Sequence, residues 1–220
     1  MFQSKVTQAL PITMKQLSSL GIVATAGLFL AASPALAHHP FDGKTPTNAF
    51  EGFLSGLGHP VIGLDHLAFV ITAGLLAAVM GRGLSIPVGF VLASLMGTVV
   101  HLMGVSLPAP EFFISASVLL FGVLLAMRQQ PQTSVVVGLA ALAGLFHGYA
   151  YGEAVIGADM APIMAYLLGF ASIQMAIALG SYWVAKRFGA SEQAPSMNLR
   201  FAGFTLAGVG AAFLSGVVLG

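Results

Sequence analysis

The sequence contains few charged residues and no cysteine. Of its 220 residues only 7% are charged and 57% are hydrophobic, whereas soluble domains carry about 25% charged residues. So little charge cannot cover a surface that faces water, which excludes a soluble enzyme and a disordered protein. A net charge of +1 provides no basic patch for a nucleic acid. Without cysteine there is no disulfide, thiolate metal site or cysteine nucleophile. The composition predicts an all-α integral membrane protein.

The first 37 residues have the features of a secretory signal peptide. Lys5 and Lys15 precede an apolar stretch from Leu17 to Ala32, and the small residues of Ala35–Ala37 follow. A basic start, a short apolar core and a small-x-small end are typical of a signal peptide that is removed from the mature protein. We expect cleavage after Ala37, with the new N-terminus outside. The alternative is an uncleaved first span.

Residues 38–58 are expected to form an external segment, and residues 59–220 a six-helix transmembrane domain. Phe50, Phe53 and Leu57 give the external segment an apolar side, which we expect to lie on the mouth of the bundle. Six apolar runs follow, each close to the roughly 20 residues that cross a bilayer. They predict six transmembrane helices at residues 60–80, 86–105, 111–127, 134–152, 161–185 and 201–219.

The charged residues of the loops predict how these helices are oriented. With the mature N-terminus outside, the second, fourth and sixth loops face the cytoplasm. They carry five of the six basic residues that follow the signal peptide, namely Arg82, Arg128, Lys186, Arg187 and Arg200. An excess of Lys and Arg in cytoplasmic loops is the usual pattern for membrane proteins. The pattern therefore predicts a multi-pass membrane protein with its mature N-terminus outside.

Several ionisable residues lie inside or at the ends of the expected spans. Such residues cost about 2.5–3.5 kcal/mol at the centre of a bilayer, so each is a candidate functional residue. At 1.5 Å per residue, all of them fall in the outer half of the membrane, on three helices. Asp65, His66, His101 and His147 lie within spans, and His59 and Glu153 lie at span ends.

The first of these helices has a distinctive start. Pro60 suits the first position of a helix, where its missing N–H costs nothing, so we expect His59 to cap a helix that begins there. Asp65 and His66 are neighbours and therefore point about 100° apart on a helix. We expect one to bind a ligand while the other supports it.

Imidazole and carboxylate groups without thiolates suit borderline divalent ions such as Ni²⁺, Co²⁺ or Zn²⁺, with Cu²⁺ as a further option. The residues therefore predict a metal site. The mature terminus would begin with His38 and His39, whose imidazoles and free α-amine would chelate a metal before it reaches the helices. The alternative is that these two residues form a disordered tail.

The run His59-Pro-x-x-Gly-x-Asp65-His66, together with the stretch around Glu153, resembles the HupE/UreJ family of bacterial nickel and cobalt permeases. The resemblance covers essentially the whole mature chain. It implies a six-helix inner-membrane permease without a permanent cofactor. The family takes up Ni²⁺ or Co²⁺ for hydrogenase, urease or cobalamin synthesis.

The resemblance also implies metal-binding roles for individual residues. His59, Asp65 and His66 belong to the motif of the first span, and His147 and Glu153 to that of the fourth. The second motif departs slightly from the family pattern, because Gly152 directly precedes Glu153. His101 is added from its depth alone.

The sequence thus predicts a secondary permease that is not an enzyme. It has no G-x-x-x-x-G-K-[ST] run, so the chain itself is not an ATPase. Three alternatives stay open. His101 and His147 would clamp a haem in an electron-transfer protein, a His/Asp site would serve an intramembrane hydrolase, and a metal-binding accessory protein would transport nothing.

Overall fold

The structure is a computed structural model, and it describes residues 44–81, 83–187 and 195–220. The expected signal peptide, its cleavage site and the candidate ligands His38 and His39 lie outside the described residues. Within the described ranges the regular structure is helical. The elements are α2 (Ala49–Ile62), α3 (Leu64–Val79), α4 (Ser85–Leu102), α5 (Pro110–Ala126), α6 (Thr133–Gly152), η1 (Glu153–Val155), α7 (Met160–Arg187) and α8 (Met197–Leu219).

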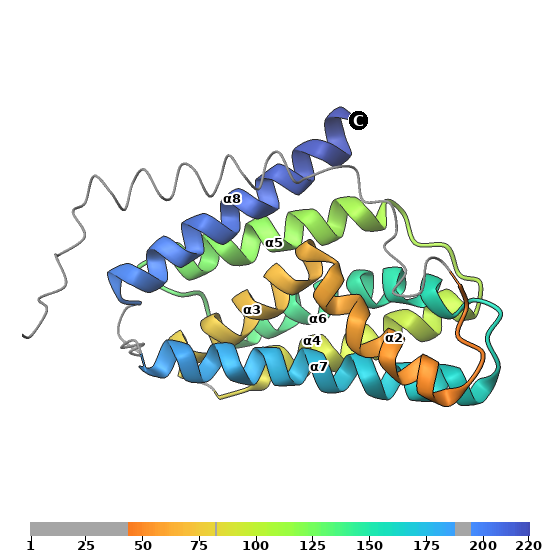
Figure 1. Cartoon of the computed structure of the whole chain (residues 1–220). Coiled ribbons are helices and arrows are strands. Elements are labelled where there is room, and N and C mark those ends of the chain that lie inside the picture. Colours follow the sequence, from red (N-terminus) through yellow and green to blue (C-terminus); the bar gives the residue numbers. More distant parts are fainter. Residues whose placement is uncertain (1–43, 82, 188–194) are drawn as a thin grey trace, which may run out of the picture.

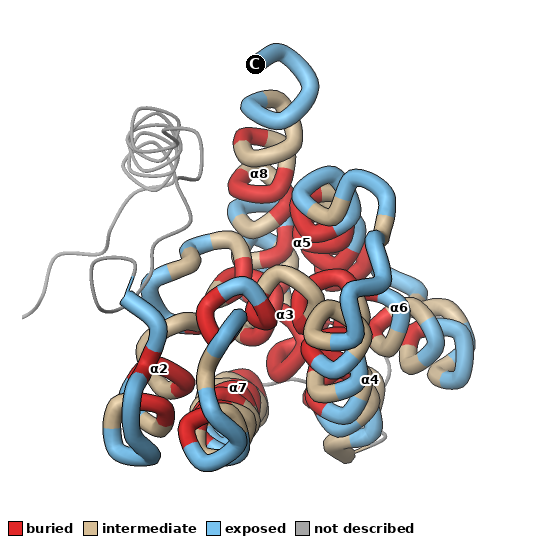
Figure 2. Tube along the Cα trace, turned by 90° about the vertical axis from the view of Figure 1, so that its right-hand side faces the viewer, coloured by how far each residue is buried: buried red, intermediate tan, exposed pale blue. Residues whose placement is uncertain are grey.

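Helix α3 lies at the centre of the bundle, and three pairs of helices surround it (Figures 1 and 2). The pairs are α2 with α7, α4 with α6, and α5 with α8. From Ala68 to Val79 every residue of α3 except Ile71 is buried. A helix that is apolar on all sides is expected in such a central position.

Small residues bring the paired helices close together. A Cβ added at Gly97 of α4 would overlap the carbonyl oxygen of Leu145 on α6, and one at Gly56 of α2 would overlap that of Tyr166 on α7. Gly122 of α5 packs in the same way against the backbone of Ala207 on α8. Small residues allow this approach between helices in lipid, where van der Waals packing drives association.

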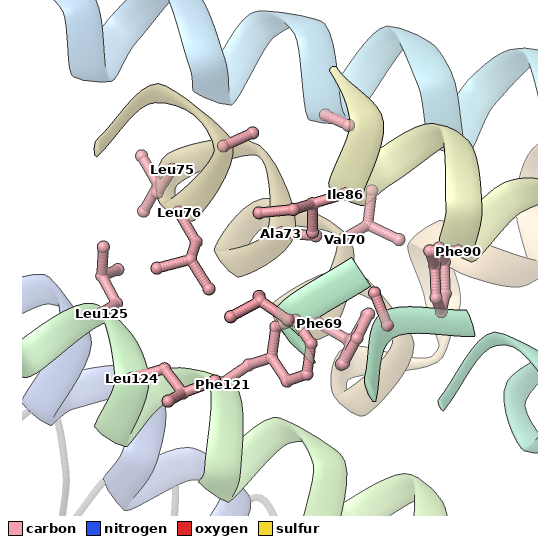
Figure 3. Packing of buried hydrophobic residues seen from close by; sticks show 14 of the residues in the cluster. Phe69, Val70, Ala73, Leu75, Leu76, Ile86, Phe90, Phe121, Leu124 and Leu125 are labelled. Carbon is pink, nitrogen blue, oxygen red and sulfur yellow. The ribbon is translucent and has the colours of Figure 1, made fainter. Parts of the chain in front are cut away.

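Aromatic and aliphatic side chains fill the core around α3 (Figure 3). The ring of Phe69 lies 4.6 Å from the ring of Phe90 on α4 and 4.6 Å from that of Phe121 on α5, measured between centroids. All three rings are buried. This cluster joins α3 to two of the three helix pairs and forms the floor beneath the polar residues described below.

Four helices of the described part, α4, α6 (extended through η1), α7 and α8, are long and apolar enough to cross a membrane. The bent pair α2–α3 makes a fifth span if its two arms count as one, and α5 is a shorter apolar helix of 17 residues. Large apolar side chains such as Leu92, Met164 and Phe204 are exposed on these helices. The chain is therefore a multi-pass helical membrane protein, and the expectation of six crossings stays a prediction.

Four of the five described basic residues, all except Lys44, lie near helix ends that gather on one side of the bundle. Arg128 follows the end of α5, Lys186 and Arg187 end α7, and Arg200 lies in the first turn of α8. Figure 1 places these three helix ends together. The arrangement agrees with the loop charges, while the orientation in a membrane stays a prediction.

The start of the first predicted span differs from expectation. Pro60 lies near the end of α2 rather than at the start of a helix, and His59 is in the last turn of α2 rather than at an N-cap. The chain breaks at Gly63, where α2 and α3 meet at an angle of 80°. Proline is tolerated here because its missing N–H removes only one bond from a helix that is about to end.

The segment before this break also packs differently from expectation. Helix α2 lies along α7 through its small residues, with Gly52 against Pro162. Phe50 stays 71% exposed, whereas Phe53 and Leu57 are partly buried, so the expected apolar side is covered only in part. The reason is steric, because only the glycine side of α2 lets the two backbones approach closely.

Candidate metal centre

The break at Gly63 brings two of the predicted residues face to face. The rings of His59 on α2 and His66 on α3 lie 6.1 Å apart between centroids. His66 is buried, while His59 and Asp65 are partly buried. On a continuous helix, residues seven positions apart would be separated by about 10 Å along the axis. The bend therefore brings the rings of His59 and His66 side by side, whereas a straight helix would place them at different depths in the membrane.

Asp65 lies in the first turn of α3. Its Oδ1 accepts a hydrogen bond of 2.8 Å from the backbone N–H of His66. A carboxylate in the first turn also faces the positive end of the helix dipole. Asp65 and His66 are thus joined through the backbone, and the His66 ring is left for contacts with other helices.

His66 and His147 form a buried hydrogen-bonded pair between α3 and α6. Their Nδ1 atoms lie 2.8 Å apart. The Nε2 atom of His147 lies 3.0 Å from the hydroxyl oxygen of Ser117 on α5. Both ring nitrogens of His147 are therefore engaged within the protein, and this chain of contacts connects three helices.

His59 is held by a tyrosine from the opposite side of the centre. The hydroxyl of Tyr166 on α7 donates to the carbonyl oxygen of Tyr151 at 2.8 Å and lies 3.0 Å from Nδ1 of His59. The ring of Tyr151 contacts both His59 and His66, with centroids 5.1 and 4.6 Å away. Two tyrosines thus close the centre between α6 and α7.

Apolar rings cover the deeper side of the histidine pair. Phe69 and Phe90 lie 4.8 and 5.3 Å from the ring of His147, and His147 is fully buried. Such surroundings strengthen the hydrogen bonds of the pair and make an unpaired polar atom costly. The polar atoms of the centre therefore face one another and the break at Gly63.

Two predicted residues lie outside this group of contacts. The ring of His101 packs against Tyr149 at 4.3 Å, and its Nδ1 is buried without a hydrogen-bond partner. Glu153 is exposed in η1, directly after α6. Within the described residues, no group of three or more His, Asp or Glu side chains is arranged to hold a metal ion. His101 and His147 do not face a common site, so the arrangement does not favour a haem between them.

Sequence reasoning missed three residues of the centre: Ser117, Tyr151 and Tyr166. A signal existed for Tyr151, which follows His147 by four positions and so lies on the same side of α6. No signal marked Ser117 or Tyr166, because serine and tyrosine in apolar helices usually serve packing and helix–helix hydrogen bonds.

Comparison with known proteins places this membrane protein in a family. The fold and the centre define a multi-pass helical protein with a buried histidine pair beside a broken helix. The family model described as "HupE / UreJ protein" matches residues 26–213. The chain is also 31% identical over 169 residues to "Protein HupE" from Rhizobium leguminosarum bv. viciae, covering 76% of this chain and 86% of that protein. No solved structure matches.

The chain belongs to the HupE/UreJ family. The resemblance drawn from the residues around His59 and Asp65 is therefore confirmed, and it extends over most of the chain.

Proposed function

We propose that the protein is a secondary transporter that takes up divalent transition-metal ions, Ni²⁺ or Co²⁺. The observation that carries the proposal is that histidines lie together at a helix break inside an apolar bundle. Membership of the HupE/UreJ family adds to it. Broken helices place side chains and free backbone groups at ion sites in many secondary transporters. By family relation, the metal would serve hydrogenase, urease or cobalamin synthesis.

The ligand set of the proposal is His59, Asp65 and His66, which surround the break at Gly63. Two imidazoles and a carboxylate suit Ni²⁺ or Co²⁺ better than the all-oxygen sets that bind Mg²⁺ or Ca²⁺. His147 supports His66 from behind, because both nitrogens of His147 are engaged. Glu153 is exposed at the end of α6, where it would help to attract the hydrated cation.

Transport on this proposal requires the centre to change shape. Asp65 Oδ1 is occupied by the backbone N–H of His66, so a small movement about Gly63 would be needed to bring the carboxylate to the metal. Gly63 has an extended backbone between two helices, and a residue at such a junction is suited to act as a hinge. Binding and release would then follow the closing and opening of the 80° bend.

The orientation of the proposal places the mature N-terminus, the break and Glu153 outside, in the bacterial inner membrane. Its support is the gathering of Arg128, Lys186, Arg187 and Arg200 near one end of the bundle. Reporter fusions after Arg128 and after Glu153 test it, with the first expected in the cytoplasm and the second outside. The opposite result would reverse the direction of transport.

Metal-resolved uptake tests the function in cells that lack other nickel and cobalt importers. Cells that express the protein should accumulate Ni²⁺ or Co²⁺, and Asp65→Asn or His66→Ala should abolish accumulation without loss of membrane insertion. Asp159→Asn is the matched control, since it removes an exposed carboxylate from the loop before α7. Normal uptake by both centre variants would contradict the site.

The same experiment separates the alternatives. A purified protein with a Soret band would favour an electron-transfer protein, and metal binding without accumulation would favour an accessory protein. His101→Ala tests the ligand predicted from depth alone. The contacts of His101 with Tyr149 lead us to expect that this variant keeps most of its uptake.

A further inference from the structure

We propose that Ser117 is a positioning residue that sets which nitrogen of His66 is presented to the metal, acting through His147. The inference rests on the proposed function, because it concerns the readiness of His66 as a ligand. It adds a residue on α5, a helix that carries none of the candidate ligands.

The hydrogen-bond partners assign the protons along this chain. The carbonyl oxygen of Ile114 can only accept, so the hydroxyl of Ser117 donates to it, at 2.6 Å. The hydroxyl has a single hydrogen, so its oxygen must accept a hydrogen bond from His147 Nε2–H, at 3.0 Å. Ser117 thereby places the proton of His147 on Nε2.

A neutral imidazole carries one N–H and one lone pair. With its proton on Nε2, His147 offers the Nδ1 lone pair, and His66 must donate its Nδ1–H across the 2.8 Å contact. The lone pair of His66 is then on Nε2. A histidine that binds metal through one nitrogen commonly donates the N–H of the other to a supporting group.

The position of the His66 ring relative to Gly63 indicates where the Nε2 lone pair lies. Nε2 is bonded to Cδ2, and Cδ2 is the atom that a Cβ at Gly63 would approach to 2.6 Å. The Cδ2 corner of the ring, to which Nε2 is bonded, therefore lies beside the helix break at Gly63. The proton order set by Ser117 thus directs the lone pair of His66 to the place where the metal is proposed to bind.

His59, the other histidine of the proposed ligand set, is held in the same tautomer by a separate group of hydrogen bonds. Tyr166 donates its hydroxyl hydrogen to the carbonyl oxygen of Tyr151, so its oxygen accepts from His59 Nδ1–H. His59 then also carries its lone pair on Nε2. Two separate chains of hydrogen bonds, one from α5 and one from α7, prepare the two imidazoles in the same tautomer.

Ser117→Ala removes the acceptor that holds the proton on His147 Nε2. The other tautomer of His147 then donates from Nδ1 to His66, which moves the proton of His66 to Nε2 and removes the metal-binding lone pair. Loss of a supporting group of this kind lowers metal affinity by about 10–100-fold. We expect the metal concentration for half-maximal uptake to rise by about that factor.

Two further variants on α5 separate this role from packing. Ser117→Thr keeps the hydroxyl, and a cavity of about 120 Å³ beside Ser117, lined in part by Phe113 and Ala143, offers room for the added methyl group. It should retain the uptake affinity of the wild type. Ser115→Ala, at another buried serine two positions away along α5 and therefore on another side of the helix, should change uptake little.

The deciding measurement is the nitrogen-15 NMR spectrum of histidine-labelled full-length protein in lipid bilayers without metal. His66, identified by the signal lost in His66→Gln, should show Nδ1 protonated in the wild type and in Ser117→Thr. Ser117→Ala should shift it toward protonated Nε2.

Two results would overturn the inference: a wild-type His66 that is protonated on Nε2, or a Ser117→Ala variant with both an unchanged tautomer and unchanged uptake affinity. The wild-type spectrum decides even if Ser117→Ala fails to fold. If the wild type transports no metal but shows the expected tautomers, the proposed function fails while the positioning role of Ser117 stands.

Discussion

The Nδ1 atoms of His66 and His147 lie 2.8 Å apart, although 81 residues separate the two histidines in the chain. The contact joins the broken end of the central helix to α6. Together with the contact of His147 Nε2 to Ser117, it leaves His147 with no nitrogen for an ion. The pair thus contains one candidate ligand and one supporting residue, and the predictions below follow from this asymmetry and from the packing around it.

Substitution of the two histidines should have unequal effects. His66→Ala should abolish uptake at every metal concentration, because it removes a proposed ligand. His147→Ala should raise the metal concentration for half-maximal uptake by about 10–100-fold and leave uptake at saturating metal. Metal titration of uptake measures both. Complete loss in both variants would instead make His147 a ligand.

Gly63 should not tolerate a side chain. A Cβ there would lie 2.6 Å from Cδ2 of His66 and 3.3 Å from Oδ1 of Asp65. Overpacking of this kind costs about 1–3 kcal/mol, and about 1.4 kcal/mol corresponds to a tenfold change in an equilibrium. Uptake by Gly63→Ala should fall by about tenfold or more. Gly180→Ala is the control, since that site on α7 opens to free space and uptake should persist.

The close approach of α4 and α6 should depend on Gly97. A Cβ at this position would overlap the carbonyl oxygen of Leu145, and a backbone atom cannot move aside as a flexible side chain can. Gly97→Ala should therefore lower the thermal stability of the detergent-solubilised protein, by a free energy of about 1–3 kcal/mol. Gly138→Ala on α6 meets open space. An equal loss of stability in both variants would argue against close packing at Gly97.

Arg200 should stabilise the junction of α5 and α8. Its Nε donates a hydrogen bond of 2.9 Å to the carbonyl oxygen of Ala126, at the end of α5. A cation at a helix C-terminus also complements the helix dipole. Arg200→Ala should cost about 1–2 kcal/mol of stability, measured by thermal unfolding. Arg187→Ala removes the same charge from an exposed site and should cost less.

Much of the fold could be predicted because bilayer length and apolar composition are local properties. Five of the six apolar runs each correspond to a helix whose ends lie within a few residues of the predicted ones, such as 134–152 against Thr133–Gly152. The exception is the first run. Pro60 is compatible both with the first turn of a helix and with the last, and only the packing of α2 along α7 decided between them.

The candidate centre was predicted in part. An acid and histidines within apolar spans stand out in a chain with 7% charge, and so His59, Asp65, His66 and His147 could be singled out. Their depths were estimated along straight helices, which the bend at Gly63 invalidated. For His101 the same estimate gave the level in the membrane but not the side of the helix that faces the centre, and the ring of His101 packs on Tyr149 instead.

The sequence by itself determined that this is a helical membrane protein of the HupE/UreJ family. A scarcity of charge and a short motif can both be recognised without knowing which residues are in contact. Only the tertiary structure decided which polar atoms meet. Ser117 is one of several unremarkable serines until α5 brings it to His147, 30 residues later in the chain. Hydrogen bonds act over about 3 Å, and no periodicity in the sequence specifies distances between separate helices at that precision.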